Sequence, residues 1–104
     1  MNETIEFEVI DKKNKDVTLK GYIYKEDIND DNPDIYYYNN LGLEVGSYIP
    51  SNPFEENSKE WEAYNDLITA FQTDFLFIQY LSDYADEDKT VPRDGYILKI
   101  NNGE

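Results

Sequence analysis

Apolar and polar side chains alternate along the first part of the chain. In residues 4–10 every second position is apolar, and residues 17–24 repeat this alternation with an interruption at Gly21. The link between them, residues 11–16, is polar and typical of a turn. Because successive side chains of a strand point to opposite faces, the pattern predicts a β-hairpin with one face on a core and the other in water.

A second, shorter hairpin is predicted in the next part of the chain. Residues 27–34 are rich in Asp and Asn and contain Asn-Pro, which favours a loop. Residues 35–38 are predicted to form a short strand, and Asn39-Asn40 a turn. Residues 41–49 are expected to return as a strand that two glycines weaken, and residues 50–57 to form a connection.

A helix is predicted to begin near Asn57. Asn57 followed by Glu60 fits a capping box, and acidic residues suit the N-terminal end of a helix. Side chains at helical spacing then form one apolar stripe, made of Trp61, Tyr64, Leu67, Ile68 and Phe71.

The length of this helix depends on how residues 74–81 are interpreted. The stripe can continue through Phe75, Ile78, Leu81 and Ala85, and no Gly or Pro lies between 58 and 88. These observations favour one main helix that covers about 57–72 and continues without a break to about 86. The alternative is a buried, aromatic strand at 74–81, because periodicity alone does not separate short apolar runs.

The C-terminal part is predicted to contain a loop and one last strand. Residues 82–94 are expected to contain an acidic loop at 83–88, residues 95–100 to form a strand, and residues 101–104 a frayed tail. The fold class that follows is α+β. We expect a single domain over residues 1–104, with an antiparallel sheet of four to five strands packed against the main helix.

The acidic charge is confined to one part of the chain. The protein has 23 acidic and 9 basic residues and a net charge of −14, whereas small soluble domains usually carry about 2–8 charges of either sign. Residues 27–88 hold 15 of the acids and one base, Lys59, while the two flanking segments are nearly neutral. A proteome adapted to salt would be acidic throughout. This distribution therefore favours a surface with a specific role.

Composition excludes several classes of function. Strong acidity disfavours direct binding to nucleic acid or to an anionic membrane, because both interactions need cationic side chains. The absence of Cys and His removes thiolate, imidazole and Cys/His zinc chemistry. The sequence has no apolar run of membrane length and no signal-peptide pattern, so we expect a cytoplasmic protein without metal or cofactor.

Two chemical sites are considered and not supported. Asp27, Asn29 and Asp31 occupy the first three ligand positions of a calcium-binding EF-hand loop, but Asn32 replaces the required Gly and Tyr38 the required Glu. A solvated turn is the favoured interpretation. Two carboxylates at glycosidase spacing will occur by chance among so many acids, yet phosphate-loop and nucleophile motifs are missing. The chain is therefore expected not to be an enzyme.

Tyrosines form the first candidate surface for binding a partner. Tyr36, Tyr37 and Tyr38 lie in a predicted strand, so at least one ring must face solvent. Exposed tyrosines suit a protein interface, although tyrosine is also simply a common strand residue, and the two explanations are equally supported. Tyr22 and Tyr24 are expected to share the face opposite Leu19 only if the register slips at Gly21.

Three acidic runs form the second candidate surface. Carboxylates on alternate strand positions or on one helix face are about 5–7 Å apart, a spacing that resembles a row of phosphates. The first run is Asp27, Asp30, Asp31 and Asp34; the second is Glu55, Glu56, Glu62 and Asp66, with Asn57 among them; the third is Asp83, Asp86, Glu87 and Asp88.

The favoured function is that of a non-enzymatic binding protein. Its acidic surface would mimic nucleic-acid phosphates and dock into the basic groove of a nucleic-acid-binding enzyme, such as a nuclease or defence effector. In size and charge the chain resembles phage-encoded DNA mimics of the anti-restriction and anti-CRISPR type. The alternatives are an immunity protein that neutralises a cognate toxin nuclease, which gene neighbourhood would distinguish, and an acidic structural or regulatory module.

Overall fold

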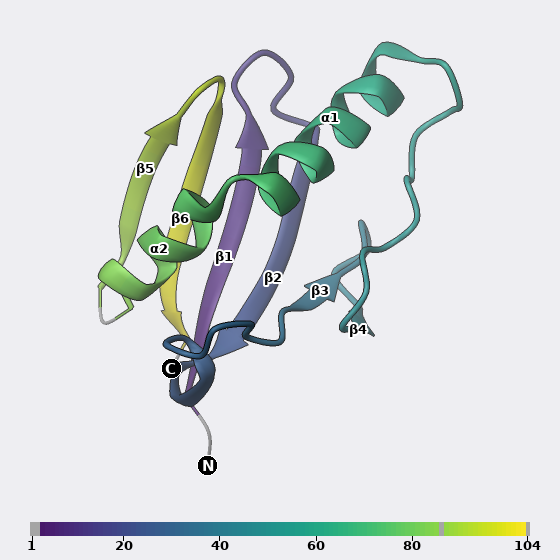
Figure 1. The fold of residues 1–104 in the computed structure, drawn as a ribbon. Coiled ribbons are helices and arrows are strands. Elements are labelled where there is room, and N and C mark those ends of the chain that lie inside the picture. Colours follow the sequence, from purple (N-terminus) through teal and green to yellow (C-terminus); the bar gives the residue numbers. More distant parts are fainter. Residues whose placement is uncertain (1–2, 86, 104) are drawn as a thin grey trace.

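A computed structural model describes residues 3–85 and 87–103 and shows an antiparallel sheet with two helices on one face (Figure 1). The fold class is α+β, as expected, but the sheet has six strands rather than four to five. Their order across the sheet is β4-β3-β2-β1-β6-β5. The strands are β1 (Thr4–Asp11), β2 (Thr18–Tyr24), β3 (Tyr36–Tyr38), β4 (Glu44–Gly46), β5 (Lys89–Arg93) and β6 (Tyr96–Gly103), and the helices are α1 (Lys59–Thr73) and α2 (Phe75–Asp83).

The predicted N-terminal hairpin is confirmed as β1 and β2. Their register runs without interruption and places Phe7 opposite Gly21. A Cβ atom at Gly21 would lie 2.7 Å from the Phe7 ring and would also meet the Tyr36 carbonyl oxygen. Gly21 therefore does not break the strand. It leaves the space that the Phe7 ring fills on the buried face of the sheet.

The second hairpin is present but shorter than predicted. The Asn39 side-chain oxygen accepts hydrogen bonds from the backbone N–H groups of Leu41 and Leu43, at 2.9 and 3.0 Å, so the turn extends beyond Asn39-Asn40. Gly42 and Gly46 adopt φ values of +81° and +110°. Gly42 lies in the turn before β4, and Gly46 is the last residue of β4, where it pairs with Tyr37 beside a shift in register. The return strand predicted at 41–49 is therefore limited to β4.

Helix α1 begins at Lys59, and its N-cap lies one residue later than predicted. Asn57 has a φ of +69°, and Ser58 is the N-cap residue. The Ser58 hydroxyl accepts a hydrogen bond from the backbone N–H of Trp61 at 3.1 Å. The capping box of Asn57 and Glu60 was therefore the wrong assignment. The left-handed backbone of Asn57 turns the chain, and the shorter serine side chain provides the cap.

Residues 75–81 are helical rather than a strand, but one continuous helix to 86 is wrong because Asp74 interrupts it. Asp74 has an extended backbone, with φ −100° and ψ 101°. It is both the C-cap residue of α1 and the N-cap residue of α2. The interruption changes which side chains face the sheet. Phe77 and Leu81 are buried, whereas Phe75, which the continuous stripe would have placed inward, is 87% exposed.

The prediction missed strand β5, because it placed only an acidic loop at 83–88 and no strand between residues 82 and 94. Asp94 and Gly95 have φ values of +44° and +91° and form a tight turn between β5 and β6. An Asp-Gly pair between strand-like segments is a strong hairpin signal, and Pro92 fits because β5 lies at the edge of the sheet. The last strand reaches Gly103, so the frayed tail expected at 101–103 is paired with β1 instead; Glu104 lies outside the described residues.

One apolar core joins the helices to the sheet. The Phe7 and Phe71 rings stack with centroids 5.1 Å apart, and Phe77 packs 5.7 Å from Phe71. No polar or charged side chain among the described residues is buried in this core. The buried members of the cluster are Ile5, Phe7, Val9, Val17, Leu19, Ile23, Ile28, Tyr37, Tyr64, Leu67, Phe71, Phe77, Leu81, Leu98 and Ile100.

Candidate partner-binding surfaces

The two faces of the sheet differ in what covers them. Helices α1 and α2 lie on one face (Figure 1), and the side chains that point to them are the aliphatic and phenylalanine residues of the core. The opposite face, which neither α1 nor α2 covers (Figure 1), carries the side chains of the alternate residues in each strand. Register pairs on this open face include Glu8 with Lys20 and Tyr22 with Tyr36.

Four tyrosines form a cluster on the open face, which we call the tyrosine face. Tyr22 stacks on Tyr36 with ring centroids 5.2 Å apart, and Tyr24 meets both rings edge-on at 5.6 and 5.7 Å. Tyr38 lies 5.7 Å from Tyr22. The rings shelter one another, which leaves only 8% of Tyr22 exposed although no helix covers it. The prediction that part of the 36–38 run faces solvent is therefore confirmed for Tyr36 and Tyr38.

Carboxylates surround the tyrosine face. The Tyr22 hydroxyl donates a hydrogen bond to Glu44 at 2.7 Å, and the Tyr38 hydroxyl reaches Glu6 at 3.5 Å. Partial burial, and then the negative charges of Asp34 and Asp27, raise the pKa of Tyr36. Burial and the hydrogen bond to Glu44 likewise raise the pKa of Tyr22. Both shifts favour the neutral phenols of Tyr22 and Tyr36 beside these acids.

Tyr37 points to the other side of the sheet. It is 6% exposed, its ring meets Phe7 edge-on at 6.5 Å, and burial raises its pKa to about 12. The three consecutive tyrosines thus divide between two environments, as the strand alternation requires. Tyr37 belongs to the core and to the lining of the groove described next.

The first acidic run lies beside a groove. Residues 27–34 run along the end of α2, where the Ser82 hydroxyl donates a hydrogen bond to the Asn29 side chain at 3.1 Å. Asp30 and Asp31 line a groove of about 590 Å³ that α2 borders on its other side. Among the described residues, no Lys or Arg forms an ion pair with Asp27, Asp30, Asp31 or Asp34.

The second run is only partly brought together. Glu62 and Asp66 are exposed on α1 and line a hollow of about 540 Å³ with Lys13 and Lys59. Glu55 and Glu56 are exposed in the connection before α1 and do not line this hollow. The hollow therefore has mixed charge, and the structure does not place these four carboxylates in one row.

The third run follows α2. Asp83 accepts a hydrogen bond from Gln79 at 2.9 Å, and Glu87 and Asp88 are exposed before β5. The Lys89 ammonium lies 5.1 Å from the Tyr84 ring centroid, which places a cation next to this run. Asp86 lies outside the described residues.

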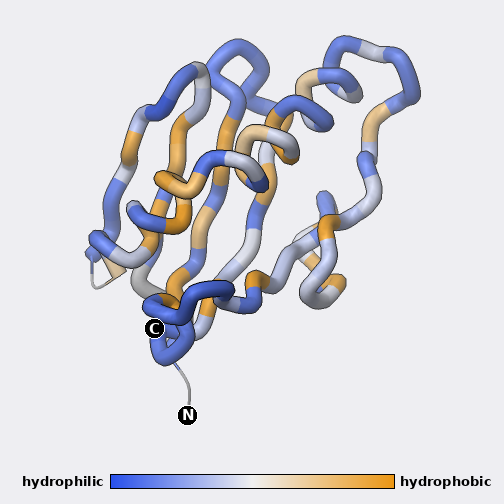
Figure 2. The backbone as a smooth tube through the Cα atoms, in the orientation of Figure 1, coloured by the Kyte–Doolittle hydropathy of each residue, from blue (hydrophilic) through white to orange (hydrophobic). Residues whose placement is uncertain are grey.

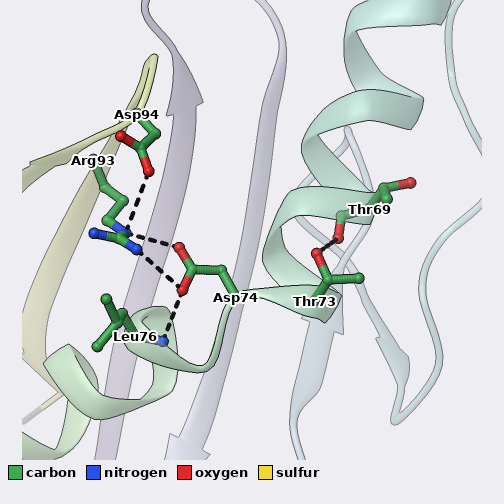
Figure 3. Close-up of polar contacts among 6 residues, drawn as sticks. All are labelled: Thr69, Thr73, Asp74, Leu76, Arg93 and Asp94. Atoms are coloured by element: carbon green, nitrogen blue, oxygen red, sulfur yellow. Dashed lines mark hydrogen bonds and ion pairs between the residues drawn. The ribbon is translucent and has the colours of Figure 1, made fainter.

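Asp74 and Arg93 form a polar contact that the sequence did not indicate. Arg93 Nε donates to Asp74 Oδ2 at 2.8 Å, and the other carboxylate oxygen accepts from the backbone N–H of Leu76 (Figure 3). These bonds lower the pKa of Asp74 below its usual value, with the Arg93 hydrogen bond as the main cause. Thr73 closes the preceding turn by donating to the Thr69 carbonyl at 2.8 Å. The contact holds α2 to strand β5.

Sequence reasoning missed four residues of these surfaces. Tyr22 and Tyr24 lie opposite Leu19 with no slip at Gly21, because plain alternation already puts even-numbered residues of β2 on the open face. The prediction that they share this face only if the register slips at Gly21 was therefore wrong. Glu44 reaches Tyr22 through the β3–β4 hairpin, and the exposure of Phe75 follows from the break at Asp74; neither has a local signal in the sequence.

The described residues carry neither a metal cluster nor a membrane span. No group of three or more acidic side chains among them converges as a metal site would require. No helix in the part that the structure describes is long and apolar enough to cross a bilayer.

Comparisons with other proteins give no relative from which to transfer a function. No protein-family model matches the sequence. No curated protein and no solved structure matches it significantly. The function is therefore inferred from the chain's own residues.

Proposed function

We propose that this protein is a non-enzymatic inhibitor whose acidic surface docks into the basic groove of a nucleic-acid-binding enzyme. The observation that carries the proposal is the confinement of 15 acids and a single base to residues 27–88. A free energy of repulsion opposes the packing of so many like charges, so a surface of this kind is maintained at a cost to stability. A cationic partner would offset that cost.

The dimensions of the molecule support mimicry of a short duplex. B-form DNA carries one charge for about every 1.7 Å of its axis, so 14 charges correspond to about 24 Å of duplex. The longest extent of the protein is 40 Å, so its surface is long enough to present charges over a length of that size. The segment before β3 is mostly hydrophilic, as is the stretch that leads directly into α1 (Figure 2). The first holds Asp27, Asp30, Asp31 and Asp34, and the second holds Glu55 and Glu56.

The biological setting that fits best is a phage or mobile-element protein that inhibits a bacterial defence nuclease. Such an inhibitor acts in the cytoplasm of the host cell and binds protein rather than nucleic acid. Long-range attraction would accelerate its association with a cationic nuclease, and local charge pairs would fix the orientation.

A pulldown of partners from bacterial lysate tests the proposal. We expect a basic nucleic-acid-binding protein to be retained, to be released as salt rises from about 50 to about 200 mM, and to be displaced by duplex DNA. Identification of the captured protein separates the two biological settings. A defence nuclease supports the proposal, and a toxin nuclease encoded beside this gene supports the immunity alternative.

Charge reversal locates the surface once that partner is purified. Changing Asp30 and Asp31 to Lys should abolish inhibition, because the exposed run loses two acids and gains two bases. The matched control changes Asp16 and Glu3 to Lys, which alters the net charge equally in the balanced N-terminal segment. Equal loss of inhibition in both variants would contradict mimicry, as would binding that neither salt nor DNA affects. If inhibition is lost only in the double variant Tyr36→Ala with Tyr38→Ala, the interface is aromatic instead.

A further inference from the structure

The groove between the first acidic run and α2 combines an apolar interior with an acidic border. It has a volume of about 590 Å³, and the buried Tyr37 and Phe71 line it together with Ile35 and Ile78. This is within the usual size range of ligand sites, about 300–1,000 Å³. The interior can therefore receive at least one bulky apolar side chain.

Phe75 stands at the border of the groove almost wholly in water. It is the first residue of α2, lines the groove, and is 87% exposed, while its neighbour Leu76 is 39% exposed. The Asp74 cap and its bond to Arg93 anchor the backbone at the start of α2, from which Phe75 projects. An exposed aromatic ring beside an apolar groove is typical of an interface residue with a large binding contribution.

The charge of the groove indicates what would occupy it. Its lining contains Asp30, Asp31 and Asp74 and no Lys or Arg. Arg93 compensates Asp74, whereas no described base pairs with Asp30 or Asp31. A second copy of this chain would bring the same acidic border and a net charge of −14, so repulsion disfavours it.

We infer that this groove binds a cationic, amphipathic segment of a protein partner. An apolar side chain of that segment enters the groove against Phe75 and Ile78, and flanking Lys or Arg side chains pair with Asp30 and Asp31. The inference rests on the proposed function, because it takes the partner to be basic. It adds that recognition requires an apolar anchor, which phosphate mimicry alone does not.

The test uses the full chain and two synthetic peptides of about three helical turns. One carries leucines on a single helical face and lysines elsewhere, and in the other serines replace the leucines. Calorimetry gives each Kd, and amide chemical shifts map the contact. We expect the leucine peptide to bind roughly tenfold more tightly than the serine peptide and to shift residues lining the groove.

Variants separate the apolar anchor from the charges. Phe75→Ser should raise the Kd of the leucine peptide roughly tenfold, while Leu41→Ser, at a residue 76% exposed outside the groove, should leave it unchanged. The double variant Asp30→Asn with Asp31→Asn should bind the leucine peptide more weakly, and its Kd should depend less on salt concentration. Glu55→Gln with Glu56→Gln removes the same charge elsewhere and should change both far less.

Three outcomes would overturn the inference: equal affinity for both peptides, an unchanged Kd in Phe75→Ser, or shifts confined to the tyrosine face. The mapping uses unmodified protein, so it decides the question even if a variant misfolds. Failure here leaves the proposed function intact, since salt-sensitive, DNA-competed capture of a nuclease does not depend on the groove. Conversely, groove binding without such capture would contradict only the proposed function.

Discussion

Residues 1–26 and 89–104 build four adjacent strands, β2, β1, β6 and β5, whereas residues 27–88 supply β3, β4 and both helices. Acids and bases nearly balance in the two outer segments, and the middle segment carries the whole excess charge. The outer segments form two hairpins, one at each end of the chain, and the pairing of β1 with β6 joins them into one contiguous sheet. The middle segment extends this sheet at one side and covers one of its faces.

The difference shows how the fold accommodates a large negative charge. The middle segment attaches to the sheet through apolar side chains, of which Leu67, Phe77 and Leu81 are among the most buried. Its acids remain at the surface, where water screens their repulsion. The polar side-chain contacts between the two parts include Asp74 with Arg93 and Tyr22 with Glu44.

The largest effect is expected from breaking the apolar attachment. Phe77 is 1% exposed, so Phe77→Ala should lower the free energy of unfolding by about 3–5 kcal/mol. Phe75→Ala, two residues earlier on the same helix, should change it by less than about 0.5 kcal/mol. Urea unfolding of both variants measures the contrast. Equal losses would show that α2 is not docked as described.

An intermediate effect is expected at Asp74, which links α2 to β5. Asp74→Ala removes the helix cap and the ion pair and should cost about 1–2 kcal/mol, whereas Asp74→Asn keeps a capping side chain and should cost about half as much. The folded-state pKa of Asp74 is lowered. The advantage of Asp over Asn is therefore present above the unfolded-state pKa of 3.8 and disappears as pH falls through the folded-state value. Urea unfolding across this pH range checks both points; a gap that persists in acid would contradict the ion pair.

The smallest effect is expected on the tyrosine face. Tyr22→Phe removes the 2.7 Å hydrogen bond to Glu44 and should cost about 1 kcal/mol, while Tyr38→Phe loses only a 3.5 Å contact and should cost less. The pKa of Tyr22 is raised in the folded protein. Its contribution is thus complete below pH of about 10 and is lost as pH rises through the folded-state pKa. Thermal melts at neutral and alkaline pH test this, and Tyr22→Phe should lose less stability in alkali than the unchanged protein.

Local pattern was sufficient for much of the fold. Alternation identified β1, β2 and the core face of β6, and helical spacing identified Tyr64, Leu67 and Phe71 as buried. These signals succeed because one face of each element must leave water, which imposes a period of two or of 3.6 on the sequence. Strand β5 was missed although its Asp94-Gly95 turn is a local signal.

Other features depended on contacts between distant residues. The break at Asp74 is held by Arg93, nineteen positions away in the chain, and it decides that Phe77 is buried and Phe75 exposed. The tyrosine face needs β2 and β3 in register. The groove needs residues 28–35 packed beside α2. None of these pairings has a periodic signal, because each is formed by elements that meet only in the folded state.

The sequence by itself determined the α+β class, the main apolar faces and the confinement of the acidic charge to residues 27–88, since composition and periodicity are properties of the chain. Only the tertiary structure decided which of those acids lie together. Packing placed Asp30 and Asp31 beside an apolar groove and Glu62 and Asp66 beside Lys13 and Lys59. The reason is that charges of one sign do not attract one another, so their grouping is set by the apolar contacts that fold the segment around the sheet.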